Sequence, residues 1–413
     1  MSLEVLTYPF IFFGLYFEIF MLVTFLSLPA KSRRDRVSST TYPSVAIIVP
    51  CWNEETTVAG TVQSLLALEY PKDKLGIILV NDGSTDNTKE VMDRYLGDPQ
   101  ITVIHKENGG KHTAINLGIA RAQEFEFFGC LDADSFVAPD ALKEMMSSFT
   151  HPKIAASTPA MSVFKPKNFL ERIQNAEYIF GITVRHILSA VNGIYVTPGP
   201  FSVYRRAVVE ELGGFKHAHQ AEDMEMALRM QRAGYEIENA PRARVYTKVP
   251  HTISKLIKQR TRWTTGFLRN VLLDYRDLFN NPTNRVLGSV VLPLGFISII
   301  GGIGLFFVTL YIIGKNIVHT YFFVTSGVPL SYFLTPHFSP DWFYAPLTFV
   351  SIISSMVFAL SLSFITVGRR ISGTDSFSFT GILGYAFLYG FIAPLWLMRS
   401  LFDLITGNRR AWR

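Results

Sequence analysis

Two aspartates separated by one alanine, in the stretch GCLDADSF at 129–136, have the spacing of a metal site. They follow an apolar run typical of a strand, and side chains two positions apart in an extended segment lie on the same side. Like charges this close repel each other unless a cation compensates them, and Mg²⁺ is usually bound by one or two carboxylates together with substrate phosphates. Asp132 and Asp134 therefore suit a divalent cation. The alternative is an Asp-rich turn in which Asp134 or Ser135 caps the next helix.

Two further acidic positions have both a chemical and a structural interpretation. Asp82, in VNDGSTD, ends a predicted strand and could accept hydrogen bonds from a nucleobase or a ribose, or could form an Asx turn. Asp223 follows Glu222 at the start of HQAEDMEMALRMQRAGY, where Met226 and Met230 mark the apolar face of a helix. A carboxylate there could be the general base for an attacking hydroxyl, or could only complement the helix dipole.

The segment KQRTRWTTG at 258–266 combines cations, an amide and an indole. On a helix, Gln259, Arg262 and Trp263 share one face. Arg262 could neutralise a leaving diphosphate, and Trp263 could stack on the apolar face of a sugar. The alternative is an amphipathic helix at a membrane surface, with Lys, Arg and Trp at the level of the lipid headgroups.

The elements that must position these residues are strands alternating with helices. Apolar runs rich in β-branched residues occur at 44–50, 75–80, 101–105 and 125–131. Their alternation with helical patterns predicts an α/β domain with a mostly parallel sheet covered on both faces. Ligands of such sheets bind at the carboxyl ends of the strands, which is where the unusual polar residues cluster. Neither G-x-G-x-x-G nor a P-loop motif is present, so a dinucleotide site or a P-loop site is not indicated.

The remaining chain is strongly apolar. Of 413 residues, 48% are hydrophobic; 5–30 carry one charge, Glu18, and 286–314, 342–368 and 376–398 carry none. Each run is long enough for the ~20-residue helix that crosses a bilayer. We therefore divide the chain into an N-terminal transmembrane helix with a basic linker, a globular domain, amphipathic interface helices and a C-terminal transmembrane domain, at 1–36, 37–250, 251–285 and 286–413.

Basic residues orient these spans. KSRRDR at 31–36 favours a cytoplasmic globular domain, and GRR at 368–370 agrees with it. GNRRAWR at 407–413 agrees only if 376–398 is re-entrant or interfacial, so two or three spans follow the domain. We expect a multi-pass protein of the cell (inner or plasma) membrane, in contact with lipids whose anionic headgroups match its net charge of +6. The basic residues are not interleaved with aromatics as in a nucleic-acid site.

Together, these motifs resemble one known family. A strand-end Asp, NGGKHTAINLG, D-A-D, E-D and Q-R-T-R-W follow in order on a domain that precedes apolar spans. This series resembles the inverting, membrane-bound family 2 glycosyltransferases with a GT-A fold, and above all the processive poly-N-acetylglucosamine, hyaluronan, chitin and cellulose synthases. The resemblance covers about 44–266 by motif and the later spans by layout. It implies a GT-A nucleotide-sugar-binding domain with one transmembrane helix before it and two or three after it.

On the donor side, the resemblance implies roles for five residues. Glu55 and Asp82 would contact the uridine of a UDP-sugar, and Lys111 would lie near the nucleotide and its diphosphate. Asp132 would assist binding of the nucleotide sugar. Asp134 would coordinate Mg²⁺ or Mn²⁺ on the diphosphate.

On the acceptor side, Asp223 would be the catalytic base. Gln259, Arg260, Arg262 and Trp263 match the Q-x-x-R-W signature, which binds the acceptor end and the leaving group. One departure is Ala221, where many members have Thr before the E-D pair.

The spans and their GVPL loop at 327–330 resemble poly-N-acetylglucosamine synthases best, whereas the F-x-V-T-x-K motif of cellulose synthases has no match. We therefore expect transfer of GlcNAc from UDP-GlcNAc to a growing β-linked polysaccharide, with a small membrane accessory subunit as a further partner to consider. One alternative is transfer of a single sugar to a lipid acceptor. A sugar nucleotidylyltransferase would carry a Gly-rich basic loop in place of CWNEE, and a non-enzymatic scaffold would be expected to lack one of the acids or the Trp.

Overall fold

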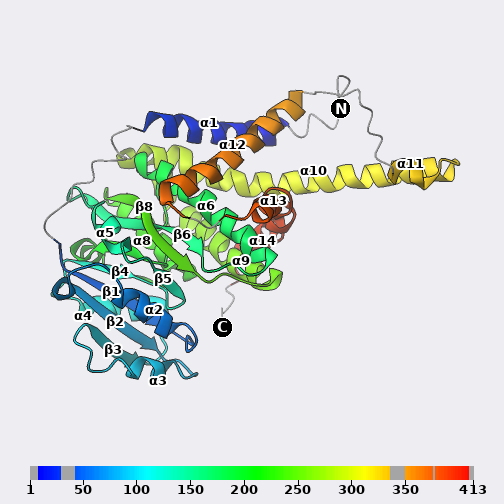
Figure 1. Cartoon of the computed structure of the whole chain (residues 1–413). Coiled ribbons are helices and arrows are strands. Elements are labelled where there is room, and N and C mark those ends of the chain that lie inside the picture. The colour runs from blue at the N-terminus through cyan, green and yellow to red at the C-terminus, as the bar shows by residue number, and fades with distance from the viewer. Residues whose placement is uncertain (1–7, 29–41, 335–348, 375–376, 409–413) are drawn as a thin grey trace.

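The computed structural model describes residues 8–28, 42–334, 349–374 and 377–408. An α/β domain forms one end of the molecule, and long helices cross one another at the other end (Figure 1). The basic cluster at 31–36, on which the predicted orientation depends, lies outside the described residues.

An eight-stranded sheet organises the α/β domain, in the order β3-β2-β1-β4-β7-β6-β8-β5. Its strands are β1 (Val45–Cys51), β2 (Leu75–Asp82), β3 (Ile101–Lys106), β4 (Phe127–Cys130), β5 (Ser135–Val137), β6 (Ile154–Val163), β7 (Ser202–Arg205) and β8 (Glu236–Thr247). The four strands predicted from the sequence, β1 to β4, pair in parallel. The other half is mixed, because β7 is antiparallel to both β4 and β6, β5 is antiparallel to β8, and β6 is parallel to β8.

Strand β1 shows why these residues form a central strand. Val45 to Val49 are all fully buried. Side chains alternate between faces along a strand, so Ala46 and Ile48 join the core on one face while Val45, Ile47 and Val49 join the core on the other. Such continuous burial is typical of a strand covered by helices on both sides.

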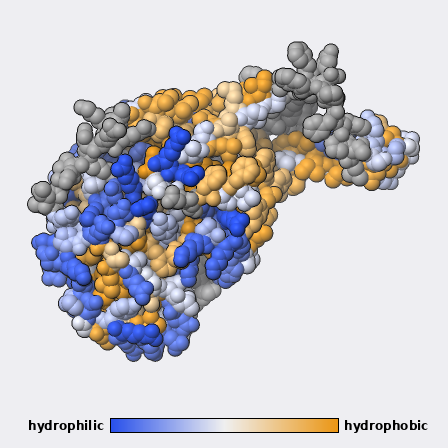
Figure 2. Space-filling view, in the orientation of Figure 1, coloured by the Kyte–Doolittle hydropathy of each residue, from blue (hydrophilic) through white to orange (hydrophobic). Residues whose placement is uncertain are grey.

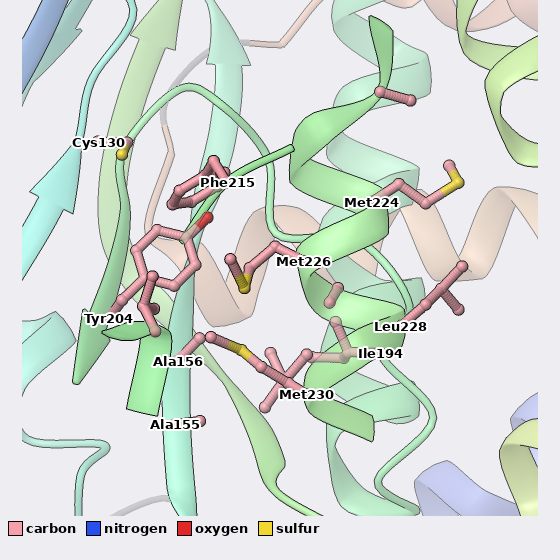
Figure 3. Packing of buried hydrophobic residues seen from close by; sticks show 14 of the residues in the cluster. Cys130, Ala155, Ala156, Ile194, Tyr204, Phe215, Met224, Met226, Leu228 and Met230 are labelled. Carbon is pink, nitrogen blue, oxygen red and sulfur yellow. The ribbon is translucent and has the colours of Figure 1, made fainter. Parts of the chain in front are cut away.

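Helices α2 (Val58–Leu66), α3 (Thr88–Asp93), α4 (Lys111–Arg121), α5 (Ala141–Met146), α6 (Phe169–Ala190), α7 (Arg206–Glu211), α8 (Glu222–Arg232) and α9 (Ile253–Arg269) follow or connect the strands. The predicted apolar face of α8 is confirmed, since Met226 and Met230 are fully buried. In Figure 3 both point from α8 into a cluster that includes Tyr204 of β7. This packing fixes the helix whose first turn carries Asp223.

The apolar helices are α1 (Tyr8–Ser27), α10 (Leu292–Thr325), α11 (Leu330–Leu334), α12 (Phe349–Ser372), α13 (Phe379–Phe387) and α14 (Tyr389–Ile405). In the described part of the chain three segments are long and apolar enough to cross a membrane: 8–27, 287–325 and 351–372. Helices α13 and α14 meet at a 52° bend, as a broken span or a re-entrant loop would. One span before the domain and two or three after it agree with the prediction. Figure 2 shows an apolar surface over α10 and a hydrophilic one over much of the α/β domain.

Polar contacts join these helices to one another and to the domain. The Ser361 hydroxyl on α12 donates to Oε1 of Glu18 on α1 at 2.6 Å. Helix α9 packs against α14, where Ser400 donates to the carbonyl of Thr261 at 3.3 Å and Arg269 donates to the carbonyl of Asp403 at 3.0 Å. The α9 segment is therefore attached to an apolar helix on one side and to the α/β domain on the other.

Candidate active site

The loops after β1 and β2 are tied together at the carboxyl edge of the sheet. Asn53, whose φ of 56° lies in the left-handed region, accepts from the Thr85 amide at 2.8 Å. The Glu54 amide donates to the Thr88 hydroxyl at 2.7 Å, and the Asn87 amide donates to Oε2 of Glu55 at 3.0 Å. Two loops distant in sequence thus form one rim of the site, with the carboxylate of Glu55 accepting a bond from the other loop.

Asp82 anchors the glycine loop that precedes α4. Its Oδ1 accepts from Lys106 Nζ at 2.5 Å and from the Gly109 amide at 3.0 Å, and its Oδ2 accepts from the Gly110 amide at 2.9 Å. Gly110 has a φ of 90°, which a residue with a Cβ rarely adopts. A carboxylate has about four acceptor positions, so one on Asp82 remains for a ligand. The side chain is only 5% exposed.

Lys111, the first residue of α4, connects the D-A-D motif to the E-D pair. Its Nζ donates to Asp132 Oδ1 at 2.5 Å and lies 3.9 Å from Glu222 Oε1. Burial alone would lower the pKa of Lys111, but the carboxylates of Asp132, Glu222 and Asp223 raise it above its usual value. The cation therefore stays charged between two acidic motifs that are 90 residues apart in the sequence.

Asp134 lies in the turn between β4 and β5. Burial, and then the charges of Asp132 and Glu54, raise the pKa of Asp134 to about 7, while a 3.1 Å hydrogen bond from Ser135 opposes this. A carboxylate pushed so far toward its neutral form gains stabilisation from a nearby cation. Among the described residues no three Asp, Glu, His or Cys side chains are close enough to bind a metal by themselves. One or two carboxylates that share Mg²⁺ or Mn²⁺ with a ligand's phosphates fit this donor set.

Asp223 lies in the first turn of α8. Its carbonyl accepts from the Thr197 hydroxyl at 2.7 Å, which fixes the start of the helix against the loop before β7. Burial, and then the charge of Glu222, raise the pKa of Asp223 to about 6, although Lys111 and Arg262 act to lower it. A carboxylate with a pKa near 6 can accept a proton at neutral pH more readily than an ordinary aspartate.

Helix α9 places Arg262 near Asp223. Gly266 packs directly on Ala221, since a Cβ on Gly266 would lie 2.6 Å from the Ala221 Cβ. The N-terminal end of α8 and the last turn of α9 are therefore in contact. Arg262 is close enough to lower the pKa of Asp223, which places a cation beside the expected base.

Other residues of the Q-R-T-R-W segment hold α9 in place. Arg260 is 4% exposed and donates to Glu177 Oε2 at 2.7 Å, and the Tyr389 hydroxyl donates to the same oxygen at 2.6 Å. The guanidinium of Arg260 also lies 4.1 Å from the ring centre of Trp263, as a cation–π contact. Arg260 thus links α9 to α6 and α14 and fixes the indole. Oε1 of Gln259 is buried and has no hydrogen-bond partner in the described part of the chain.

The structure therefore places the predicted residues in three groups. Lys111, Asp132, Asp134, Asp223 and Arg262 surround one region at the carboxyl edge of the sheet. Glu55 lies in the loop after β1 and Asp82 ends β2, and their carboxylates already accept bonds from neighbouring loops. Gln259, Arg260 and Trp263 lie on α9, with Arg260 directed to Glu177.

Sequence reasoning gave no individual role to three contributors. Glu54 acts on Asp134, Lys106 binds Asp82, and Glu177 binds Arg260. Lys106 carried a signal, because it follows the third strand at the same edge as the other polar residues. Glu177 had no such signal in the sequence, because it lies in a helix with no recognisable motif.

Comparisons with known proteins concern the family and the fold of this domain. Residues 46–213 match the family described as Glycosyl transferase family 2. A poly-beta-1,6-N-acetyl-D-glucosamine synthase of Staphylococcus epidermidis is 33% identical over 253 residues, which are 60% of this chain and 59% of the relative. The synthase of the same name from Staphylococcus aureus (strain COL) is 32% identical over 274 residues, 65% of this chain and 64% of the relative. The matches thus span about three fifths of each relative.

One solved structure covers nearly the whole chain. The mannosyltransferase PcManGT from Pyrobaculum calidifontis, in complex with GDP-Man and Mn²⁺, superposes with a TM-score of 0.66 over 98% of both chains at 17% identity. That identity is too low to carry more than the fold, and the fold agrees with the one that the motifs imply. Residues 46–213 are therefore similar to the Glycosyl transferase family 2 domain, in a chain that shares the fold of PcManGT and has apolar helices long enough to cross a membrane.

Proposed function

We propose that this chain is an inverting membrane glycosyltransferase that transfers GlcNAc from UDP-GlcNAc to a growing β-linked polysaccharide. The observation that carries the proposal is the convergence of Lys111, Asp132, Asp134, Asp223 and Arg262 at one edge of the sheet, with the pKa of Asp223 raised to about 6. The names of the two staphylococcal relatives favour GlcNAc as the sugar.

On the donor side, the UDP moiety would lie along the rim formed by the loops after β1 and β2. The remaining acceptor position of Asp82, together with Glu55, would recognise the nucleoside, and Lys111 would face the diphosphate. Asp134, assisted by Asp132, would bind Mg²⁺ or Mn²⁺, which supplies positive charge to the diphosphate as it leaves.

The chemical step divides between Asp223 and Arg262. An acceptor hydroxyl gives its proton to the Asp223 carboxylate as its oxygen forms a bond to the anomeric carbon. The bond from that carbon to the diphosphate oxygen breaks on the opposite face, so the configuration changes from α to β. Arg262 and Lys111 offset the negative charge of the departing UDP, and such preorganised stabilisation is usually the largest contribution to catalysis.

The acceptor would approach along α9, where Trp263 offers an aromatic face and Gln259 an unpaired carbonyl oxygen. The apolar helices would then conduct the polymer across the cell membrane, with the α/β domain on the cytoplasmic side and membrane lipids around it. A small membrane subunit is a further partner that fits this arrangement. Transfer of a single sugar to a lipid acceptor is the competing function.

The test is radiolabel incorporation in inverted membrane vesicles that contain the full chain and Mg²⁺, with UDP-GlcNAc and UDP-glucose supplied separately. We expect a high-mass product from UDP-GlcNAc, absent with Asp134→Ala and with Asp223→Asn. Asp73→Asn, an exposed aspartate in the turn before β2, is the matched control and should retain activity. A single labelled lipid would refute the polymerase, and equal incorporation by wild type and both site variants would refute the whole assignment.

A further inference from the structure

A second polar feature lies on α6, outside every motif described above. Arg185 is half-buried, and its Nε and Nη2 atoms are buried with no hydrogen-bond partner among the described residues. Burial lowers the pKa of Arg185 to about 10, so the guanidinium is still charged at neutral pH. A buried donor without a partner costs stability, and such a group in a native structure calls for a ligand or another explanation.

The surroundings of Arg185 place it next to the active site. Its side chain folds back along α6, because a Cβ on Gly181 would lie 3.4 Å from Nη1. Tyr178 lies three residues before Gly181 on α6 and packs in a cluster with Trp263. Asp134 is also near enough to act on the Tyr178 hydroxyl. From Tyr178 to Arg185 is seven residues, about 10 Å along the helix.

The other side of Arg185 is formed by the segment that leads to the expected base. Tyr195 lies near the guanidinium, as Tyr178 does, and the ring of Tyr195 is 5.7 Å from that of Phe267 on α9. Two residues further on, Thr197 donates to the carbonyl of Asp223. Arg185 therefore lies between a tyrosine near the D-A-D motif and a tyrosine near the catalytic aspartate, with α9 across from it.

We propose that Arg185 is an acceptor-recognition residue, which donates hydrogen bonds to an uncharged oxygen of the acceptor sugar chain, an amide carbonyl or a hydroxyl. This inference rests on the proposed function and extends it to a residue outside the Q-x-x-R-W segment. The guanidinium has donors in a fixed planar arrangement, and aromatic rings beside it suit the apolar faces of pyranose units.

A neutral sugar fits this position better than the phosphate of a lipid acceptor. Arginine clusters are the usual means of binding phosphate groups, whereas the ionisable groups beside Arg185 are the phenols of Tyr178 and Tyr195, whose raised pKa values keep them neutral. The neighbouring cation on α9, Arg260, is already paired with Glu177. A single guanidinium between two tyrosines matches hydrogen bonding to an uncharged oxygen.

The test compares acceptor and donor affinity in the purified full-length chain with Mg²⁺. The acceptor is a soluble β-linked N-acetylglucosamine pentasaccharide, the donor is radiolabelled UDP-GlcNAc, and KM is measured for each. Loss of hydrogen bonds to a charged donor predicts that Arg185→Gln raises the acceptor KM roughly tenfold to hundredfold. The donor KM should change less than about twofold, because Arg185 lies away from the donor rim. Arg185→Lys keeps a positively charged donor group, so its acceptor KM should lie between those of the wild type and Arg185→Gln.

Arg172→Gln is the matched control, since this arginine is exposed on the same helix. If acceptor and donor KM rise together in Arg185→Gln and Arg185→Lys while the Tm falls, Arg185 is only structural and the inference is wrong. If Arg185→Gln leaves transfer to the pentasaccharide unchanged but loses transfer to a polyprenyl phosphate, Arg185 binds a lipid phosphate instead and the inference is wrong. If the wild type transfers nothing to the pentasaccharide from UDP-GlcNAc, the proposed function fails, and the inference fails with it.

Discussion

The charge of Glu222 should raise the pH at which activity is lost on acidification, in addition to the larger effect of burial. Asp223 must be deprotonated to accept a proton, and burial and Glu222 together raise its pKa from 3.8 to about 6. Activity should therefore fall as the pH decreases through about 6. Replacing Glu222 by Gln removes one negative charge next to the base, so the pKa of Asp223 should decrease and the enzyme should remain active at lower pH.

The structure bounds the size of this change. The rise of about 2 pKa units corresponds to about 3 kcal/mol between the two protonation states. Burial is the larger cause and remains in the variant, while Lys111 and Arg262 act in the opposite direction, so Glu222→Gln should move the acidic limb to lower pH by on the order of 1 unit. With a pKa near 6, wild-type kcat/KM at pH 5 should be about one tenth of its value at pH 7. The variant should keep a clearly larger fraction.

The assay is UDP release by the purified full chain between pH 4.5 and 8, with saturating Mg²⁺ so that Asp134 does not titrate in the same range. Glu90→Gln, which removes an exposed negative charge from α3, is the control for net charge and should leave the profile unchanged. An acidic limb that stays at the same pH in Glu222→Gln, or moves upward, would mean that Asp223 is not the titrating base.

Three further changes test other parts of the site. Asp134→Asn should raise the half-maximal Mg²⁺ concentration by at least the roughly 10–100-fold that loss of a supporting group causes, and an unchanged Mg²⁺ titration would contradict the metal assignment. Arg260→Ala leaves Glu177 without its cation; because Glu177 is 25% exposed, the loss of unfolding free energy in detergent should be less than the ~3–5 kcal/mol of a fully buried pair. No change in Tm would show that this ion pair does not stabilise α9. Gly199→Ala places a Cβ 2.7 Å from Nζ of Lys111, so it should lower kcat/KM about tenfold or more without a large change in Tm, and full activity would show that the position of Lys111 is not critical.

The carboxyl edge of the sheet could be predicted because it depends on local patterns. Each of the first four strands is an apolar run, and a buried strand such as β1 cannot accommodate a charged residue before its end. Polar residues therefore mark where each strand leaves the core, and parallel pairing brings these ends together. For this reason Asp82, Asp132 and Asp134 could be placed in one region without coordinates.

The second half of the sheet and the role of Arg260 could not be predicted in this way. Strands β6 and β8 are long and paired with an irregular register, so their partners depend on contacts between distant segments. Arg260 matches a signature expected to face the acceptor or leaving group, yet its partner is Glu177, 83 residues earlier, in a helix with no distinguishing motif. Spacing within α9 shows which residues share a face, but the neighbours of that face come from the tertiary fold.

The length of α10 has a consequence for the region beyond the bilayer. Its 34 residues extend about 51 Å, while the hydrocarbon layer is about 30 Å thick. Even at a tilt of 40° the helix would reach about 39 Å along the membrane normal, so tilting alone cannot bury it. The uncharged part ends at Lys315, and the following turns expose Tyr321 and Phe322. The last turns of α10 should therefore emerge from the lipid as a short rod whose aromatic side chains lie at the headgroup level or beyond it.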